Sequence, residues 1–336
     1  MSVRAHARVC LVGLSLASAA PAAEAFATPS RWALAREPGA YAEEQVRAAA
    51  EVELLLDRQA NSFDVAFSPK AHTSRARRLL EEGGAARARD PYLRLVYGRV
   101  LHDLGQWQDA GAVLASVLAD PRTPVGLRDD ALSAQALNFA RLDRQDLEIE
   151  TYEDAIAFTP APHHRTTMLA NQAEAFMVQG DISRAIAGYQ AALETLAWLE
   201  SRVVPGFAPT TYWSLGVALD RSGDLNGGLA SIAKARAYDP LDRSIGSDSW
   251  FFVPPWEEDY YAALGHWLNA RSPGDVEERL GEYERTILAW KQYLARAPED
   301  GIYVPIARAR LRAAEAEALA FGKRARTPTP IEPAGR

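Results

Sequence analysis

Cysteine is almost absent from this sequence. Among 336 residues only Cys10 is a cysteine, and it lies near the N-terminus. A disulfide framework needs paired cysteines, and the common zinc motifs need several closely spaced cysteine or histidine ligands. The sequence therefore excludes a disulfide-stapled scaffold and predicts a fold that is held together by packing. Cys10 also lies at the start of the apolar run of the N-terminus instead of following it, which argues against a lipid anchor at this residue.

Lysine and long apolar runs are scarce as well. Only four of the 37 basic residues are lysine, and the formal net charge is −7. An acidic balance argues against a nucleic-acid groove, because such a groove needs a basic surface. The longest apolar run, residues 9–20, has about twelve residues, whereas a membrane-spanning helix needs roughly twenty. We therefore expect a soluble chain with no transmembrane segment.

The N-terminal stretch "MSVRAHARVCLVGLSLASAAPAAEAFA" is typical of a secretory signal peptide. Arg4 and Arg8 precede the apolar run, and small residues follow Pro21, which is the usual order of such peptides. The small residues fit a cut after Ala25 or after Ala27. We assign residues 1–25 to the signal peptide and expect an exported protein, periplasmic or extracellular.

Catalytic and metal-binding motifs are lacking. The sequence contains no nucleophile elbow, P-loop, zinc helix or paired CxxC motif. His163 and His164 are adjacent, so they would point about 100 degrees apart on a helix, and a solvated turn explains them better than a metal site. Glu200-Ser201 matches a pair used by some peptidoglycan-cleaving lyases, but here it ends a repeat and runs into a proline-containing loop, 201–211. We predict no catalytic, cofactor or metal site.

A repeated spacing of small residues is the main positive signal. Gly98 is followed at seven residues by Gly105 and at twelve by Ala110, and Gly216 is followed at the same steps by Gly223 and Gly228. The same steps lead from Ala173 to Gly180 and Ala185. A weaker copy starts at Ala136, and a fifth, interrupted copy contains Gly265 and Thr286. Five copies of one unit predict a repeat fold.

Each copy makes physical sense as a pair of antiparallel helices. The glycine seven residues after the first small residue allows the left-handed turn that ends the first helix. The small residue itself lets the second helix cross closely. Prolines stop the second helices, at Pro121, Pro160, Pro240 and Pro298. Neither helix can bury its apolar face alone, so neighbouring pairs should stack.

This pattern resembles the tetratricopeptide repeat (TPR) family, whose unit has about 34 residues. The matching residues in the copy at 209–242 are Tyr212, Leu215, Gly216, Gly223, Ala235 and Pro240. The copies start 37 to 49 residues apart (98, 136, 173, 216 and 265), so the connections are longer than the family minimum. The resemblance implies an all-α fold, an irregular right-handed α-solenoid of stacked antiparallel helix pairs with capping helices.

The flanks complete a domain map. Helices predicted at 41–60 and 73–82 form an N-terminal helical region or cap within 26–90. Four TPR-like pairs follow at 91–242, and an aromatic insertion with a divergent fifth pair occupies 243–300. A C-terminal capping helix is expected at 301–323, and a disordered tail at 324–336.

Two surfaces are candidates for binding. The resemblance implies that the first helices line a concave groove, and the groove positions here include Arg99, His102, Arg141, Glu174, Met177, Trp213, Arg221 and His266. The insertion "SDSWFFVPPWEEDYY" at 247–261 is the second candidate. Its aromatic residues either fold back into the core or form a docking patch made of Trp250, Phe251, Phe252 and Trp256.

We therefore predict a non-catalytic scaffold or adaptor of the cell envelope that binds a segment of a partner protein in its groove. Nothing in the sequence identifies the partner. The alternative is an envelope enzyme, or an accessory subunit, that acts on cell-wall polymer, and a deep pocket with paired carboxylates would favour it. Self-association through the ends of the solenoid is a further possibility.

Overall fold

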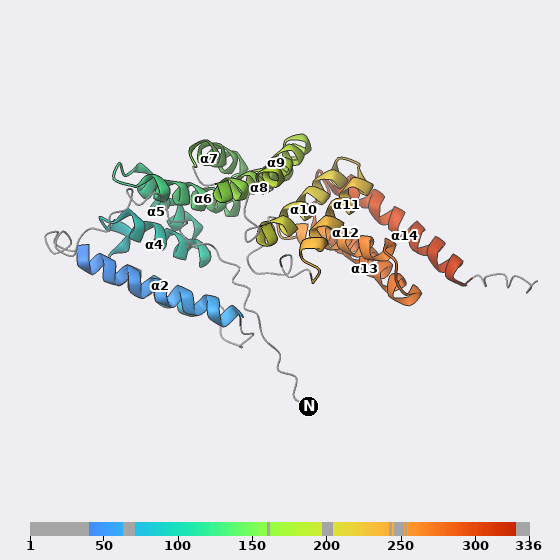
Figure 1. Ribbon diagram of the computed structural model, residues 1–336, viewed down its shortest axis with the longest axis horizontal. Helices are drawn as coiled ribbons and strands as arrows, with labels where there is room; N and C mark the ends of the chain where they lie inside the picture. The colour runs from blue at the N-terminus through green and yellow to red at the C-terminus, as the bar shows by residue number, and fades with distance from the viewer. Residues whose placement is uncertain are drawn as a thin grey trace, which may run out of the picture. The chain divides into compact units, whose positions relative to one another are not determined.

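A computed structural model describes residues 40–62, 71–159, 162–196, 204–241, 244, 252 and 254–326. Within these ranges the chain forms thirteen α-helices, one short 3-10 helix and no strand (Figure 1). The all-α class predicted from the repeat spacing is confirmed. The predicted signal peptide lies outside these ranges, as does most of the predicted tail.

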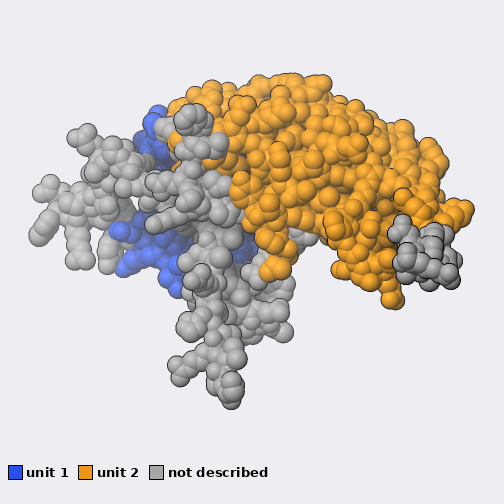
Figure 2. All heavy atoms as spheres, turned by 45° about the vertical axis from the view of Figure 1, so that its right-hand side comes forward, with its two compact units in different colours: residues 1–134 blue, residues 135–336 orange. Residues whose placement is uncertain are grey.

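The chain divides into two compact units, residues 1–134 and 135–336 (Figure 2). The division falls inside a helix, α6, and within the stretch for which the sequence predicts four continuous pairs. Each unit has its own buried core, so the two are described separately.

The first unit is built from helices on both sides of a short 3-10 turn. They are α2 (Ala40–Ser62), α3 (Ala71–Glu82), η1 (Ala85–Arg87), α4 (Pro91–Asp103), α5 (Trp107–Ala119) and the first part of α6 (Val125–Arg141). Asp90 caps α4 by accepting from the Tyr92 amide, and Pro91 occupies the first turn, where no amide donor is needed. Leu80 and Leu93 are fully buried in one core cluster of this unit, and Leu95 and Leu114 in the other.

The second unit continues the helix pairs. It contains the rest of α6, then α7 (Gln145–Phe158), α8 (Pro162–Gln179), α9 (Ile182–Leu196), α10 (Val204–Arg221), α11 (Leu225–Tyr238), α12 (Glu257–Arg271), α13 (Val276–Arg296) and α14 (Val304–Arg326). A single core of buried side chains runs through it and includes Tyr189, Trp213, Tyr260, Trp267 and Trp290.

The turn between the two helices of a pair has the predicted left-handed conformation in most copies. Gly105, Gly180 and Gly223 have φ angles of 78°, 88° and 104°, in the left-handed region that glycine tolerates best. Asp143 takes the same place in the weak copy, with φ 57°. Four copies thus have the same kind of left-handed turn at the same position. The fifth does not, because Ser272 has φ −72°.

The close crossing within each pair is also present. A Cβ added to Gly98 would lie 2.9 Å from the Leu114 side chain, and one added to Gly216 would lie 2.7 Å from Ile232 and 2.8 Å from the carbonyl oxygen of Gly228. Real Cβ atoms do not approach other atoms this closely. The small residues are therefore required by packing, and the helix pairs have a TPR-like arrangement.

One sequence expectation fails at α10. The stretch 201–211 is expected to be a loop because of its prolines and glycine, yet α10 begins at Val204 and includes Pro209. A proline inside a helix removes its amide donor and crowds the carbonyl four residues earlier, whereas the amides of a first turn have no intrahelical acceptor in any case. Pro205 lies in that first turn, and the carbonyl that Pro209 leaves without its donor is that of Pro205, near the start of the helix.

Candidate interaction surface

The eight predicted groove residues lie in different environments. Met177, Trp213 and Arg221 are buried, with exposed fractions of 0%, 3% and 8%. Arg99, His102, Arg141, Glu174 and His266 are half-buried. The first two belong to the first unit and the others to the second. Only the half-buried residues present side-chain atoms that a partner could reach.

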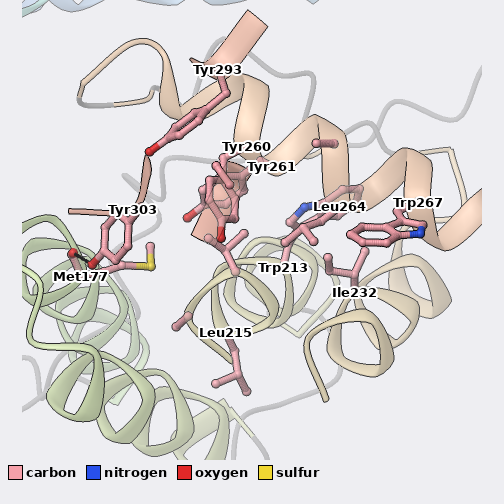
Figure 3. Close-up of a cluster of buried hydrophobic side chains, with 14 of the residues drawn as sticks. Met177, Trp213, Leu215, Ile232, Tyr260, Tyr261, Leu264, Trp267, Tyr293 and Tyr303 are labelled. Carbon is pink, nitrogen blue, oxygen red and sulfur yellow. Dashed lines mark hydrogen bonds between the residues drawn. The ribbon is translucent and has the colours of Figure 1, made fainter. Parts of the chain in front are cut away.

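The start of the C-terminal helix helps to bury two of these positions in the second unit, Met177 and Arg221. The Tyr303 hydroxyl, at the start of α14, donates a hydrogen bond to the Met177 carbonyl of α8 (Figure 3). The Arg221 guanidinium of α10 lies 3.8 Å from the centre of the Tyr303 ring. The start of α14 therefore covers residues on α8 and α10 that an open groove would expose.

Arg221 is further enclosed by α12. Its guanidinium forms an ion pair with Glu257 and lies 4.5 Å from the centre of the Tyr260 ring. A buried charge needs a partner of opposite sign and full hydrogen bonding. Arg221 therefore joins three helices in the core, and its position in the repeat does not make it a surface anchor.

Asp220, next to Arg221, makes a second connection between the same helices. Its carboxylate accepts from the Tyr260 hydroxyl at 2.7 Å and from Arg310 Nε of α14 at 2.7 Å. Burial raises the pKa of Asp220 despite these two donors. No sequence pattern pointed to Asp220, Tyr260 or Arg310 as a group, since 90 residues separate the first from the last.

Two carboxyl groups lie close to each other deeper in the second unit. Glu174 accepts from the Tyr189 hydroxyl at 2.5 Å and from the Tyr261 hydroxyl at 3.2 Å, and burial raises its pKa. Glu148 of α7 is 6% exposed. Burial and the neighbouring Glu174 raise the pKa of Glu148 to about 8. Glu148 occupies the position that is alanine or glycine in three other copies, so a carboxyl group stands where the repeat normally has a small residue.

The first unit keeps a polar, partly accessible face on α4. The Arg99 guanidinium pairs with Asp130 of α6 at 3.3 Å, and both side chains are about one-third exposed. His102 lies one turn further along α4. Tyr92, seven residues before Arg99, is on the same side of the helix, and the Arg47 guanidinium of α2 lies 5.0 Å from its ring centre.

Sequence reasoning missed Tyr92 and Arg47. Tyr92 occupies the second position of its repeat, one of the groove positions, so the spacing could have identified it. Arg47 comes from the N-terminal cap, where no repeat register is defined. It is held by Asp90 at 3.1 Å, the residue that also caps α4.

His266 and Arg141 are the remaining half-buried positions of the second unit. His266 Nδ1 lies 2.7 Å from Glu282 of α13. Burial alone would raise the pKa of Glu282, but hydrogen bonds from Arg285 and His266 outweigh it and lower the pKa. His266 therefore helps to tie α12 to α13 and offers only part of its ring to solvent.

The aromatic insertion is described in part. Phe252 and Trp256 are half-buried and pack against the core of the second unit, and the Phe252 ring meets Tyr261 edge-on at 5.0 Å. Both side chains thus have partners within the chain. Trp250 and Phe251 lie outside the described residues, and a docking role of the four-residue patch stays a prediction.

Metal and membrane features were tested on the same residues. In the described ranges no group of three histidine, cysteine or acidic residues is placed to hold a metal ion. His163 and His164 begin α8 with their rings 4.4 Å apart. None of the helices in these ranges is both long and apolar enough to cross a bilayer. Glu200-Ser201 lies outside the described residues.

Comparison with known proteins finds only distant structural likenesses. No protein-family model matches the chain, and no curated protein matches its sequence. A crystal structure of MamA is 18% identical and covers 51% of this chain and 91% of MamA, with a TM-score of 0.42. MamA from Desulfovibrio magneticus RS-1 is 18% identical over 58% of this chain and 98% of its own, with a TM-score of 0.41.

A third similar structure is the APC/C hetero-tetramer Cut9-Hcn1. It is 11% identical and covers 82% of this chain and 48% of its own, with a TM-score of 0.46. At such low identities and scores these likenesses carry no argument about function. The TPR-like arrangement rests on the helix order, the turns and the close crossings of the chain itself.

Proposed function

We propose that this protein is a non-catalytic protein-interaction scaffold of the cell envelope, and that it binds a partner segment along α4 of the first unit. One observation carries the proposal. Three of the six predicted groove positions of the second unit, Met177, Trp213 and Arg221, are buried, whereas the groove residues of the first unit, Arg99 and His102, are partly accessible, as is Tyr92 on the same helix. Tyrosine and arginine are the side chains that most often anchor a partner.

The face is suited to binding without rearrangement. Arg47 is held by Asp90 and lies over Tyr92, and Arg99 is held by Asp130. Side chains that are already ordered lose little conformational entropy when a partner arrives. A half-exposed ion pair contributes only about 0–1 kcal/mol to stability, so Arg99 can exchange Asp130 for a partner carboxylate at small cost.

The envelope location rests on the N-terminal sequence alone. Residues 1–25 have the order of a signal peptide, and we propose export on that basis. The wall-polymer alternative would be favoured by a deep pocket with paired carboxylates that the polymer can enter. Glu148 and Glu174 are such a pair, but Glu148 is packed inside the helix stack, which does not suit a general acid for a large polymer.

Affinity capture from envelope extract tests the proposal. The baits are the chain without its signal peptide, the variant R99Q/H102Q, and the control R87Q/R89Q, which changes two exposed arginines of the same unit. We expect at least one protein whose capture falls about tenfold or more in R99Q/H102Q only, since one anchor is worth more than about 1 kcal/mol.

The captured protein should then rebind the purified chain with the same preference among variants. Equal capture by all three baits would contradict the location of the site on α4. Retention of the chain by insoluble cell-wall polymer, with no protein depending on Arg99 or His102, would contradict the scaffold itself and favour the alternative.

A further inference from the structure

The fifth helix pair differs from the others in length. Gly265 and Thr286 are 21 residues apart, whereas the corresponding residues are 12 apart in the other copies. The extra residues make α13 start at Val276, more than two turns before Thr286. The last turns of α14 pack against this extension, and the Tyr283 and Phe321 rings are 5.8 Å apart.

The extension and the end of α14 line a shallow pocket that is largely open to solvent. Its lining consists of Val276, Arg279, Phe321, Arg324 and Ala325, and its volume is about 380 Å³. That volume is within the range of small-ligand sites, roughly 300–1,000 Å³. Val276 is 46% exposed and Phe321 is half-buried. The pocket thus combines accessible apolar surface with two cations.

Arg279 is held in position by neutral groups. Its Nε donates to the Ala270 carbonyl at 2.9 Å, and its guanidinium lies 4.2 Å from the centre of the Phe321 ring. Neither contact neutralises the charge. Among the residues that the structure describes, no carboxylate forms an ion pair with Arg279 or Arg324, whereas nearby Arg271 is paired with Glu317.

Two arginines that face one pocket without an acidic partner indicate an anion site. A guanidinium matches the planar shape of a carboxylate and can bind it through two parallel hydrogen bonds. Phe321 and Val276 leave room beside the charge for an apolar group. We propose that this pocket binds an acidic residue with a neighbouring apolar side chain, presented by a segment of a partner protein.

This inference adds a second binding site to the proposed scaffold and does not depend on the face of α4. The two can fail separately, because the pocket is tested with a small molecule. Inorganic phosphate would satisfy the arginines but not the apolar lining, so it serves as a comparison ligand in the test.

The probe is 3-phenylpropanoate, which joins one carboxylate to one apolar ring. Ligand-observed NMR on the chain without its signal peptide should show saturable binding. R279Q and R324Q should each weaken it about tenfold or more, because glutamine cannot form the charge-assisted hydrogen bonds of arginine to a carboxylate. R285Q is the matched control, since Arg285 lies on α13 but pairs with Glu282.

Four results would overturn the pocket as a site for acidic segments. The first is absence of saturable binding in the parent chain. The second is equal binding of the neutral amide, 3-phenylpropanamide, which would leave no role for the charge of the arginines. The third is unchanged binding in R324Q, which changes an exposed residue and should not disturb folding. The fourth is tighter binding of phosphate than of phenylpropanoate, which would indicate a phosphate site.

Discussion

At the scale of single residues, the buried carboxyl groups of the second unit work against stability. Glu148 has an ordinary pKa of 4.5 when unfolded and a pKa of about 8 when folded. Between these values the folded chain holds a proton that the unfolded chain releases. The free energy of unfolding therefore loses a contribution as pH rises from about 4.5 to 8, since each pKa unit corresponds to about 1.36 kcal/mol.

Replacing Glu148 with glutamine should remove that loss. We expect E148Q to be more stable than the parent by on the order of 2–4 kcal/mol at pH 8, with the difference shrinking toward pH 5. Urea unfolding at both pH values measures it. The control is E150Q, an exposed glutamate two residues further along α7. A gain for E148Q that is the same at pH 5 and pH 8 would contradict a protonation effect.

The sequence could not reveal the pair that causes this effect. Glu148 was visible as a departure from the small-residue rule of the repeat, and Glu174 as a groove position. Their proximity depends on how α7 and α8 pack, and the pattern of one helix does not contain that information. The same holds for Arg221, whose groove position could be read from the spacing but whose burial under Tyr303 could not.

At the scale of elements, the spacing of small residues predicted most of the helix pairs. The expected helices at 41–60 and 73–82 correspond to α2 and α3, and the expected closing helix corresponds to α14. The helix pairs could be predicted from the spacing because a turn glycine and a close crossing are local requirements, whereas the flanking helices were expected from their own apolar periodicity. The loop expected at 201–211 was wrong from Val204 onward, because α10 accommodates Pro205 in its first turn and Pro209 in its second turn.

Gly216 gives a test of the close crossing. Alanine there would place a Cβ against Ile232 and the Gly228 carbonyl. We expect G216A to lower the free energy of unfolding by about 1–3 kcal/mol, as overpacking does. Gly281 is the control, because a Cβ there would meet only Arg285, at 3.7 Å.

Thermal and urea unfolding of the two glycine variants should give opposite signs. G281A should be neutral or stabilising by up to about 1 kcal/mol, since alanine favours a helix more than glycine does. If G216A were as stable as G281A, α11 would have to shift away from α10 without cost. The tight crossing would then not be what holds this pair.

At the scale of the whole molecule, the C-terminal helix reduces the exposure of residues on two repeat helices, α8 and α10. The sequence predicts an end cap that covers one apolar face. The structure adds contacts from its first turns to α8 and α10, through Tyr303 and Arg310. These contacts join residues up to 126 positions apart, so a local sequence pattern could not predict them. They help to bury Met177 and Arg221 in the second unit, whereas both predicted groove positions of the first unit stay partly accessible, and this difference underlies the proposed function.

Hydrogen exchange can test whether α14 holds the second unit together. In the variant Y303F/R310Q, Met177 loses a donor and Asp220 loses its cationic partner, and both groups are buried. Unpaired buried polar groups cost about 1–3 kcal/mol each. Amides of α8, α10 and α12 should therefore exchange faster, while those of α4 and α5, in the first unit, should keep their rates.

The control is R308Q/R312Q, which changes two exposed arginines of the same helix and should leave all exchange rates as they are. Faster exchange in α4 and α5 as well would mean that the two units unfold together. Unchanged exchange in α8 and α10 would mean that the contacts of Tyr303 and Arg310 add nothing to the core. The groove of the second unit could then open for a partner, and the restriction of binding to α4 would lose its physical basis.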